Sequence, residues 1–148
     1  MGGQSGGEGT FSAAERTAMR ERAAELKAAG KGTGSAKKAR EAAACAEAIA
    51  ALPVQDREIA ELVHKLVAAE APHLDPKTWY GFPSYARDGK VVVFYQPASK
   101  FDTRYGTVGF SEDAHLDAGS LWPTAYAVLD VTAEVEATLQ TLIRRAAG

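Results

Sequence analysis

Aromatic and cationic side chains gather in the second half of the sequence, where they are suited to form a binding site. Eleven of the twelve aromatic residues lie between Trp79 and Tyr126. Aromatic walls combined with cationic groups fit a planar, negatively charged ligand. The residues that we expect to form such a site are Trp79, Tyr80, Tyr85, Lys90, Lys100, Arg104 and Trp122. The alternative is that the rings pack the ends of a sheet and the lysines stay in solvent.

Acidic residues and a histidine form a second candidate site, this time for a metal. Glu112, Asp113 and His115 follow one another closely. Carboxylate and imidazole groups are ligands that ferrous iron accepts, so we expect weak iron binding there if any metal binds. A second acidic group, Asp56, Glu58 and Glu61, also has an ordinary role, because acidic residues stabilise the first turn of a helix. A solvated acidic loop is the alternative for the first group.

Motifs of well-known enzyme classes are missing from the sequence. It has no Gly-x-Ser-x-Gly elbow and no His-Glu-x-x-His zinc motif. The glycine-rich stretch 30–35 lacks the Lys-Ser/Thr pair of a phosphate loop directly after its last glycine, and a helix rather than a strand precedes it, so it predicts a flexible link. The single cysteine, Cys45, excludes an intramolecular disulfide and lies in an alanine-rich segment. The sequence therefore predicts a binding or carrier protein more than an enzyme.

Composition limits the compartment and the partners. The chain has 148 residues, 46% of them hydrophobic and 24% charged, with a formal net charge of −2. These values are ordinary for a soluble globular protein and give no case for nucleic-acid binding. No apolar run reaches the roughly 18 residues of a membrane helix, and the glycine-rich start lacks a secretory signal. We expect a cytoplasmic protein that binds neither membranes nor nucleic acid.

Helices are expected on both sides of a β-rich middle. Ser12 and Glu15 have the spacing of a capping box at the start of a helix over residues 13–29, and a second alanine-rich helix is expected over 36–51. Two amphipathic stripes predict the helices that build the core. The first stripe comprises Ile59, Leu62, Val63, Leu66 and Val67, and the second comprises Val135, Leu139, Leu142, Ile143 and Ala146.

Strands are expected between these two amphipathic helices. The Asp88-Gly89 pair predicts a tight hairpin between strands at 84–86 and 91–95, and further strands are expected at 105–110 and 125–130. A short extra strand is a further alternative at 78–81. Strands so close in sequence pair antiparallel. The predicted fold class is α+β: a two-layer sandwich of an antiparallel sheet of four to five strands with helices before and after it. Residues 1–53 are expected to form a helical, partly flexible N-terminal arm, and 54–148 the α+β domain.

The two faces of the sheet follow from the alternation of side chains. If Phe94, Phe110 and Leu129 face the helices, then Tyr95, Tyr105 and Tyr126 lie on the second face. Such a face is too apolar to stay uncovered. Its cover is expected to be the N-terminal arm, a second copy of the chain in a homodimer, or a ligand.

Two motifs carry a resemblance to a known family. The runs Trp79-Tyr80-Gly81-Phe82-Pro83-Ser84-Tyr85 and Asp88-Gly89-Lys90-Val91-Val92-Val93-Phe94 resemble the signature of the YdhG-like bacterial family, and Gln96–Phe101 and Leu121–Tyr126 resemble one of its branches. Much of that family is a domain of unknown function, and one bacillar member is described as a frataxin-like intracellular iron chaperone. The resemblance covers about residues 54–148 and implies helices on one face of an antiparallel sheet. It also implies a cytosolic iron carrier that delivers iron to a protein partner. The alternative from the residues is a small-molecule-binding or protein-interaction module that uses the aromatic face.

Overall fold

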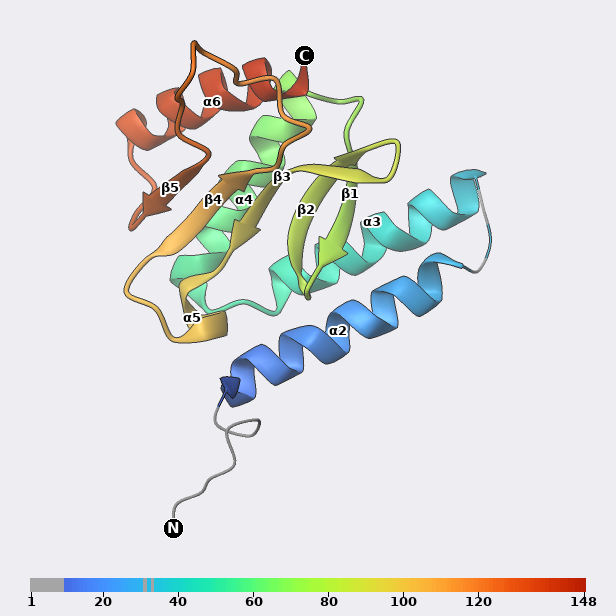
Figure 1. The fold of residues 1–148 in the computed structure, drawn as a ribbon. Helices are drawn as coiled ribbons and strands as arrows, with labels where there is room; N and C mark the ends of the chain where they lie inside the picture. Colours follow the sequence, from blue (N-terminus) through green and yellow to red (C-terminus); the bar gives the residue numbers. More distant parts are fainter. Residues whose placement is uncertain (1–9, 31, 33) are drawn as a thin grey trace.

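Five strands, each hydrogen-bonded to its neighbour along the chain, form one antiparallel sheet in the order β1-β2-β3-β4-β5. The computed structural model describes residues 10–30, 32 and 34–148 (Figure 1). The elements in chain order are α2 (Ala13–Ala29), α3 (Gly34–Ala50), α4 (Val54–Glu70), β1 (Asp75–Trp79), β2 (Phe82–Arg87), β3 (Lys90–Gln96), α5 (Ala98–Phe101), β4 (Gly106–Phe110), β5 (Ala125–Val128) and α6 (Ala133–Ala147). The predicted α+β class, with helices before and after an antiparallel sheet, is confirmed.

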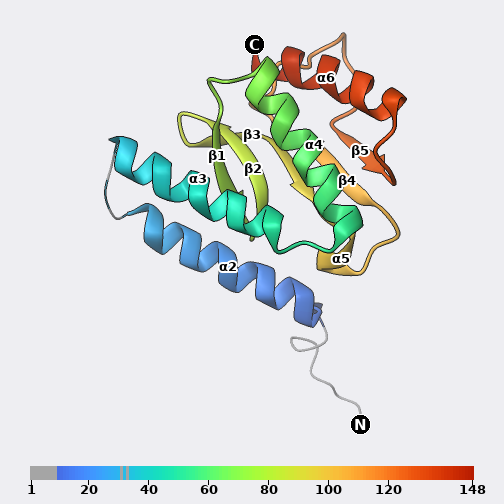
Figure 2. The same cartoon turned by 180° about the vertical axis from the view of Figure 1, so that it is seen from behind.

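The two predicted amphipathic helices, α4 and α6, pack side by side on one face of the sheet, which Figure 2 shows from the helix side. All five residues of the predicted α4 stripe are buried, as are Leu139, Ile143 and Ala146 of α6. Thr132 caps α6, since its hydroxyl accepts a hydrogen bond from the Val135 amide at 3.1 Å. The apolar stripes therefore specify where the main core lies.

The two N-terminal helices have different relations to this core. The capping box at Ser12 and Glu15 is confirmed, and α2 buries only Ala18. By contrast, α3 lies along the edge strand β1 and contributes buried Cys45 and Ile49 to the core (Figures 1 and 2). A helix beside an edge strand protects its backbone from pairing with other chains. Of the predicted flexible link, Lys31 and Thr33 lie outside the described residues.

Two tight turns build the first three strands. Asp88 and Gly89 have φ values of 52° and 82° and form the predicted hairpin turn between β2 and β3. Tyr80 and Gly81, with φ values of 53° and 83°, form a second turn of the same kind between β1 and β2. Positive φ at both central residues is what a type I′ hairpin turn requires. The extra strand near 78–81 is therefore β1, which begins earlier, at Asp75, and ends at Trp79.

The predicted assignment of the sheet faces is wrong for Phe94, Tyr95 and Tyr126. Tyr95 pairs with Val108, which pairs in turn with Tyr126, and all three lie on the helix-covered face with Phe110. Phe94 pairs with Gly109 on the opposite face. The prediction placed Phe94 and Phe110 on the same face of the sheet, whereas Val93 is the residue of β3 that pairs with Phe110. A register error of one residue between two strands exchanges the two faces of the sheet, because successive side chains point to opposite sides.

The N-terminal arm, one of the three covers expected for the second face, does not lie over the centre of the uncovered face. Figure 1 looks onto this face, and no helix of the described residues lies over β3 and β4 there. Helix α2 instead runs past the turn between β1 and β2 and contacts β1 and α5.

Within the described residues, no helix combines the length and apolar character needed to cross a membrane.

Candidate functional site

Three aromatic rings form a cluster on the uncovered face. The ring centroids of Trp79 and Phe94 lie 5.2 Å apart, those of Trp79 and Phe82 lie 5.9 Å apart, and those of Phe82 and Phe94 lie 5.7 Å apart. Trp79 meets both phenylalanines edge to face, a favourable arrangement of aromatic quadrupoles. Within the cluster, Phe82 is buried, whereas Trp79 and Phe94 are half-buried.

Small residues continue the same face beyond the rings. Phe94 lies directly over Gly109 of the next strand, so close that a Cβ there would collide with the ring. The sheet then carries Ala125 and Ala127 on β5, both exposed, and half-buried Thr107 on β4. We call this surface the open face; it comprises Trp79, Phe82, Phe94, Thr107, Gly109, Ala125 and Ala127. Beyond the strand ends, Tyr105 and Leu129 remain 39% and 53% exposed.

The turn next to the aromatic cluster is held by a carboxylate from α2. Glu25 accepts hydrogen bonds from the backbone amides of Tyr80 and Gly81, at 3.0 Å and 2.9 Å, with one oxygen each. The Arg22 guanidinium lies 5.8 Å from the centre of the Tyr80 ring. Consecutive amides in a tight turn form a concave anion site, and a charged acceptor strengthens each hydrogen bond.

A second carboxylate, one helical turn earlier on α2, joins the same site. Glu21 accepts from Lys100 Nζ at 2.5 Å, and its carboxylate also lies against Gly81. The Lys100 side chain is only 16% exposed. The structure thus brings together Trp79, Tyr80 and Lys100 of the predicted ligand site, with two carboxylates of the chain placed where an anionic ligand was expected.

The other residues of the predicted ligand site lie elsewhere. Tyr85 is fully buried under the helices, on the opposite face from Trp79. Lys90 is exposed at the turn between β2 and β3, and Arg104 is exposed with its guanidinium 5.3 Å from the centre of the Tyr105 ring. Trp122 is half-buried against the main core. These four residues therefore do not extend the site around Trp79 and Tyr80.

Buried polar groups connect α3, β2 and α4 inside the core. The Tyr85 hydroxyl lies 2.9 Å from His64 Nδ1, and the Cys45 thiol lies close to it. Burial raises the pKa of both Tyr85 and Cys45 above their ordinary values. Both groups are therefore held neutral, which favours a structural role and makes the thiol a poor nucleophile.

The loop after β4 contains a hollow of about 490 Å³. Its wall includes Phe110, Trp122 and Leu121, together with the acidic residues Glu112 and Asp117. Leu121 is 88% exposed. The charged residues that line this hollow are acidic, whereas the predicted ligand site that included Trp122 was expected to be cationic.

The residues predicted to bind a metal surround an arginine. Arg87 donates to the Asp113 carbonyl at 2.5 Å and to the Ala147 carbonyl at 2.9 Å, and its guanidinium lies 3.3 Å from His115 Nε2. Glu112 is exposed nearby. Across residues 10–30, 32 and 34–148, no three side chains of the types His, Cys, Asp and Glu come together as a group able to hold a metal ion. Asp113 and His115 instead contact the group that fastens the C-terminal end of α6.

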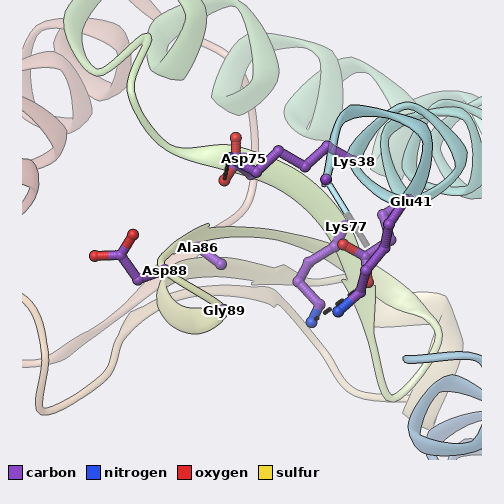
Figure 3. Close-up of a pocket in the computed structure, with 9 residues that line it drawn as sticks. Lys38, Glu41, Asp75, Lys77, Ala86, Asp88 and Gly89 are labelled. Atoms are coloured by element: carbon purple, nitrogen blue, oxygen red, sulfur yellow. Dashed lines mark ion pairs between the residues drawn. The ribbon is translucent and has the colours of Figure 1, made fainter. Parts of the chain in front are cut away.

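A charged hollow of about 280 Å³ lies between the N-terminal part of α3 and β1. Figure 3 shows Lys38 and Glu41 of α3 among the residues that line it, beside Asp75 and Lys77 of β1. Lys38 pairs with Asp75 at 3.4 Å, and Lys77 pairs with Glu41 at 4.0 Å. Because these opposite charges satisfy one another, the hollow presents no concentrated charge to a ligand.

Sequence reasoning missed Phe82, Phe94, Glu21 and Glu25 as parts of the candidate site. Two glycines could have indicated them, because Gly109 gives room to Phe94 and Gly81 gives room to the Glu21 carboxylate.

Comparison with known proteins returns no match: no family model fits the sequence, and no curated protein or solved structure is significantly similar to it. The resemblance to the YdhG-like family therefore stays a prediction.

Proposed function

We propose that the protein is a non-enzymatic binding module that docks a protein surface through its open face. The observation that carries this proposal is the aromatic cluster of Trp79, Phe82 and Phe94 mounted beside Gly109, on the face that no described helix covers. Trp79 and Phe94 stay partly exposed there, and apolar surface that the chain does not fully cover is typical of interaction sites. Aromatic side chains are also enriched in the cores of protein interfaces.

The shape of the open face favours a protein over a small molecule. Small-molecule sites are concave and enclose most of the ligand. The five hollows described for this structure are lined by other residues, and none is lined by Trp79, Phe82 or Phe94. A shallow surface with rings at one end and small side chains at the other suits the broad, flat contact of a protein interface.

A second copy of the chain fits this surface best. On the open face, the rings lie on β1, β2 and β3, and the smaller residues Thr107, Gly109, Ala125 and Ala127 lie on β4 and β5. In a two-fold symmetric contact, the same patch of each copy meets the other. The rings of one copy would then lie against the small residues of its partner, so that each half of the face complements the other half.

A charge in the middle of the small half tests this proposal. Ala127→Lys would place a charged group in the interface, and burying an unpaired charge is costly, so self-association should weaken at least about tenfold. Light scattering coupled to gel filtration measures it as a mass that falls from twice 15.6 kDa to 15.6 kDa. Ala68→Lys, at an exposed position on α4, is the matched control and should leave the mass unchanged. A monomeric mass of the unaltered chain at every concentration would contradict self-docking.

Iron delivery stays a prediction from the family resemblance. Titration of Fe(II) into the protein without oxygen tests it, with Glu112→Gln and Asp113→Asn as the variants that should weaken binding. Saturable binding that both substitutions reduce would support a carrier role, and no saturation below about millimolar iron would reject it, since a carrier must bind its metal at usable concentrations.

A further inference from the structure

The turn between β1 and β2 offers a rigid pair of hydrogen-bond donors. Tyr80 and Gly81 are two consecutive residues of positive φ, and the amide of each donates to one oxygen of Glu25. Since the turn closes a hairpin of two paired strands, these donors keep their positions whether or not a carboxylate is present. Preformed amides of this kind bind anions without the cost of rearrangement.

Lys100 supplies the second half of the anion site. Its ammonium group lies 2.5 Å from Glu21, and the Glu21 carboxylate also contacts Gly81, so Lys100 and the turn lie on two sides of the same carboxylate. Glycine is needed at position 81 twice over. It permits a φ of 83°, and any Cβ would occupy the space of the Glu21 carboxylate. The site therefore accepts two carboxylates that are four residues apart on a helix.

Within the described residues, the other contacts of α2 are few, and they include a hydrogen bond from the Arg40 guanidinium of α3 to the Ala28 carbonyl at 3.5 Å. Ala18 is its only buried residue, whereas Met19 and Leu26 are 38% and 58% exposed. A hollow of about 250 Å³ lies between α2 and α3 and is lined mainly by the alanines of the two helices and by charged residues. A helix of 17 residues that packs through few apolar side chains is marginal by its own propensity. Among these contacts, Glu21 and Glu25 make the charged links from α2 to α5 and to the turn between β1 and β2.

We propose that Tyr80, Gly81 and Lys100 form a receptor for paired carboxylates on a helix, which α2 occupies from within the chain and an acidic helix of a partner protein occupies in exchange. The partner helix carries two glutamates or aspartates spaced four residues apart, as Glu21 and Glu25 are. It needs a small residue three positions before the first of them, where α2 has Ala18. This exchange does not depend on the docking function of the open face.

A labelled peptide of residues 10–30 tests the exchange, because it is the acidic helix whose fit is already known. It is titrated into the full-length chain and into a full-length chain with Glu21→Gln and Glu25→Gln. The receptor of the second chain is intact, but its own α2 competes less. The peptide can bind only to molecules whose own α2 has left the receptor, and its apparent affinity is reduced in proportion to their fraction. Because that fraction is larger in the double variant, the peptide should bind it at least about tenfold more tightly than the unaltered chain.

Three controls make the result specific. A peptide that itself carries Glu21→Gln and Glu25→Gln should not bind either chain. Lys100→Met added to the double variant should weaken binding of the unaltered peptide about tenfold, with the melting temperature confirming that this chain is folded. Ala127→Lys, on the open face, should leave peptide binding unchanged, which separates this receptor from the proposed docking surface. Equal affinity for the unaltered and double-variant chains, or equal affinity of the two peptides, would overturn the proposal.

Discussion

The hydroxyl of Tyr85 lies 2.9 Å from Nδ1 of His64, in the middle of the core, and joins a strand to the helix that covers it. Tyr95, the other tyrosine fully buried on the same face, has no such partner: among the described residues nothing accepts from or donates to its hydroxyl. Burial, and then the nearby charge of Asp56, raise the pKa of Tyr95, so its hydroxyl stays neutral. Two tyrosines with equal burial therefore differ in what their hydroxyl groups contribute.

Removing each hydroxyl should separate the two cases. Tyr85→Phe should destabilise the protein by about 1–2 kcal/mol, because it leaves the partly buried ring nitrogen of His64 without its partner. Tyr95→Phe should leave stability unchanged or raise it by up to about 1 kcal/mol, because it removes a polar group that is buried without a hydrogen bond. Urea unfolding followed by circular dichroism measures both. Equal losses in the two variants would show that the hydroxyl of Tyr95 has a partner after all.

The contact between Phe94 and Gly109 should make the open face intolerant of one methyl group. Gly109→Ala is expected to cost about 1–3 kcal/mol, since the new Cβ must displace the Phe94 ring and, with it, Trp79. Tryptophan fluorescence should change together with the free energy of unfolding. Gly30→Ala is the matched control, because an added Cβ there meets only the Lys27 carbonyl oxygen at 3.7 Å, and it should be neutral. A neutral Gly109→Ala would mean that the rings lie elsewhere.

Two ion pairs join α4 to α6, and they should differ in their pH dependence. Glu70 accepts from Arg144 and from Gln140, both at 2.8 Å, and these hydrogen bonds hold the pKa of its carboxyl below the ordinary 4.5. A lowered pKa in the folded state stabilises the protein fully above the unfolded value and progressively less as the pH falls through the lowered one. The stability difference between the unaltered chain and Glu70→Gln should therefore be largest near neutral pH and shrink below about pH 4.5.

Glu136 provides the control for that experiment. It pairs with Lys65 at 3.3 Å, but both side chains are well exposed, 43% and 66%, and exposed pairs contribute little. Glu136→Gln should then change stability very little at any pH. If both substitutions gave the same profile between pH 3 and 7, roughly the range in which carboxyl groups titrate, the hydrogen bonds to Glu70 would not be the cause.

Cys45 should be unreactive in the folded protein. Its side chain is fully buried and its pKa is raised by that burial, so the reactive thiolate is scarce and inaccessible. Ellman's reagent should modify it only as fast as the core opens, and at once in denaturant. Cys45→Ser should show no reaction under either condition. Rapid modification of the folded chain would place the thiol at the surface and contradict the packing of α3 on the core.

The buried side of each core helix could be predicted from the sequence, whereas the buried face of the sheet could not. The stripe from Ile59 to Val67 specifies both the helix and the side that it buries, because a period of 3.6 residues occurs along one segment. A strand such as β3 carries apolar side chains on both faces, with Val93 and Tyr95 buried and Phe94 on the other side. Which face meets the helices depends on the register with β4, and no single strand contains that information.

The carboxylate site was harder still to predict. Glu21 and Glu25 have the spacing of many solvated helix surfaces, and their partners are backbone amides and a lysine that lie far along the chain. Contacts from a side chain to a distant backbone leave no pattern in the sequence of either segment. Only Gly81 indicates that something approaches closely at that turn, and a glycine in a turn usually needs no further explanation.

The order of the strands has a consequence for how fast the chain folds. The turns that join β1, β2 and β3 have two residues each, whereas residues 111–124 separate β4 from β5. Short loops lose little entropy on closure, and proteins rich in local contacts fold quickly. We therefore expect folding to begin at the paired hairpins of β1 to β3, and the addition of β5 to be the late step of the sheet.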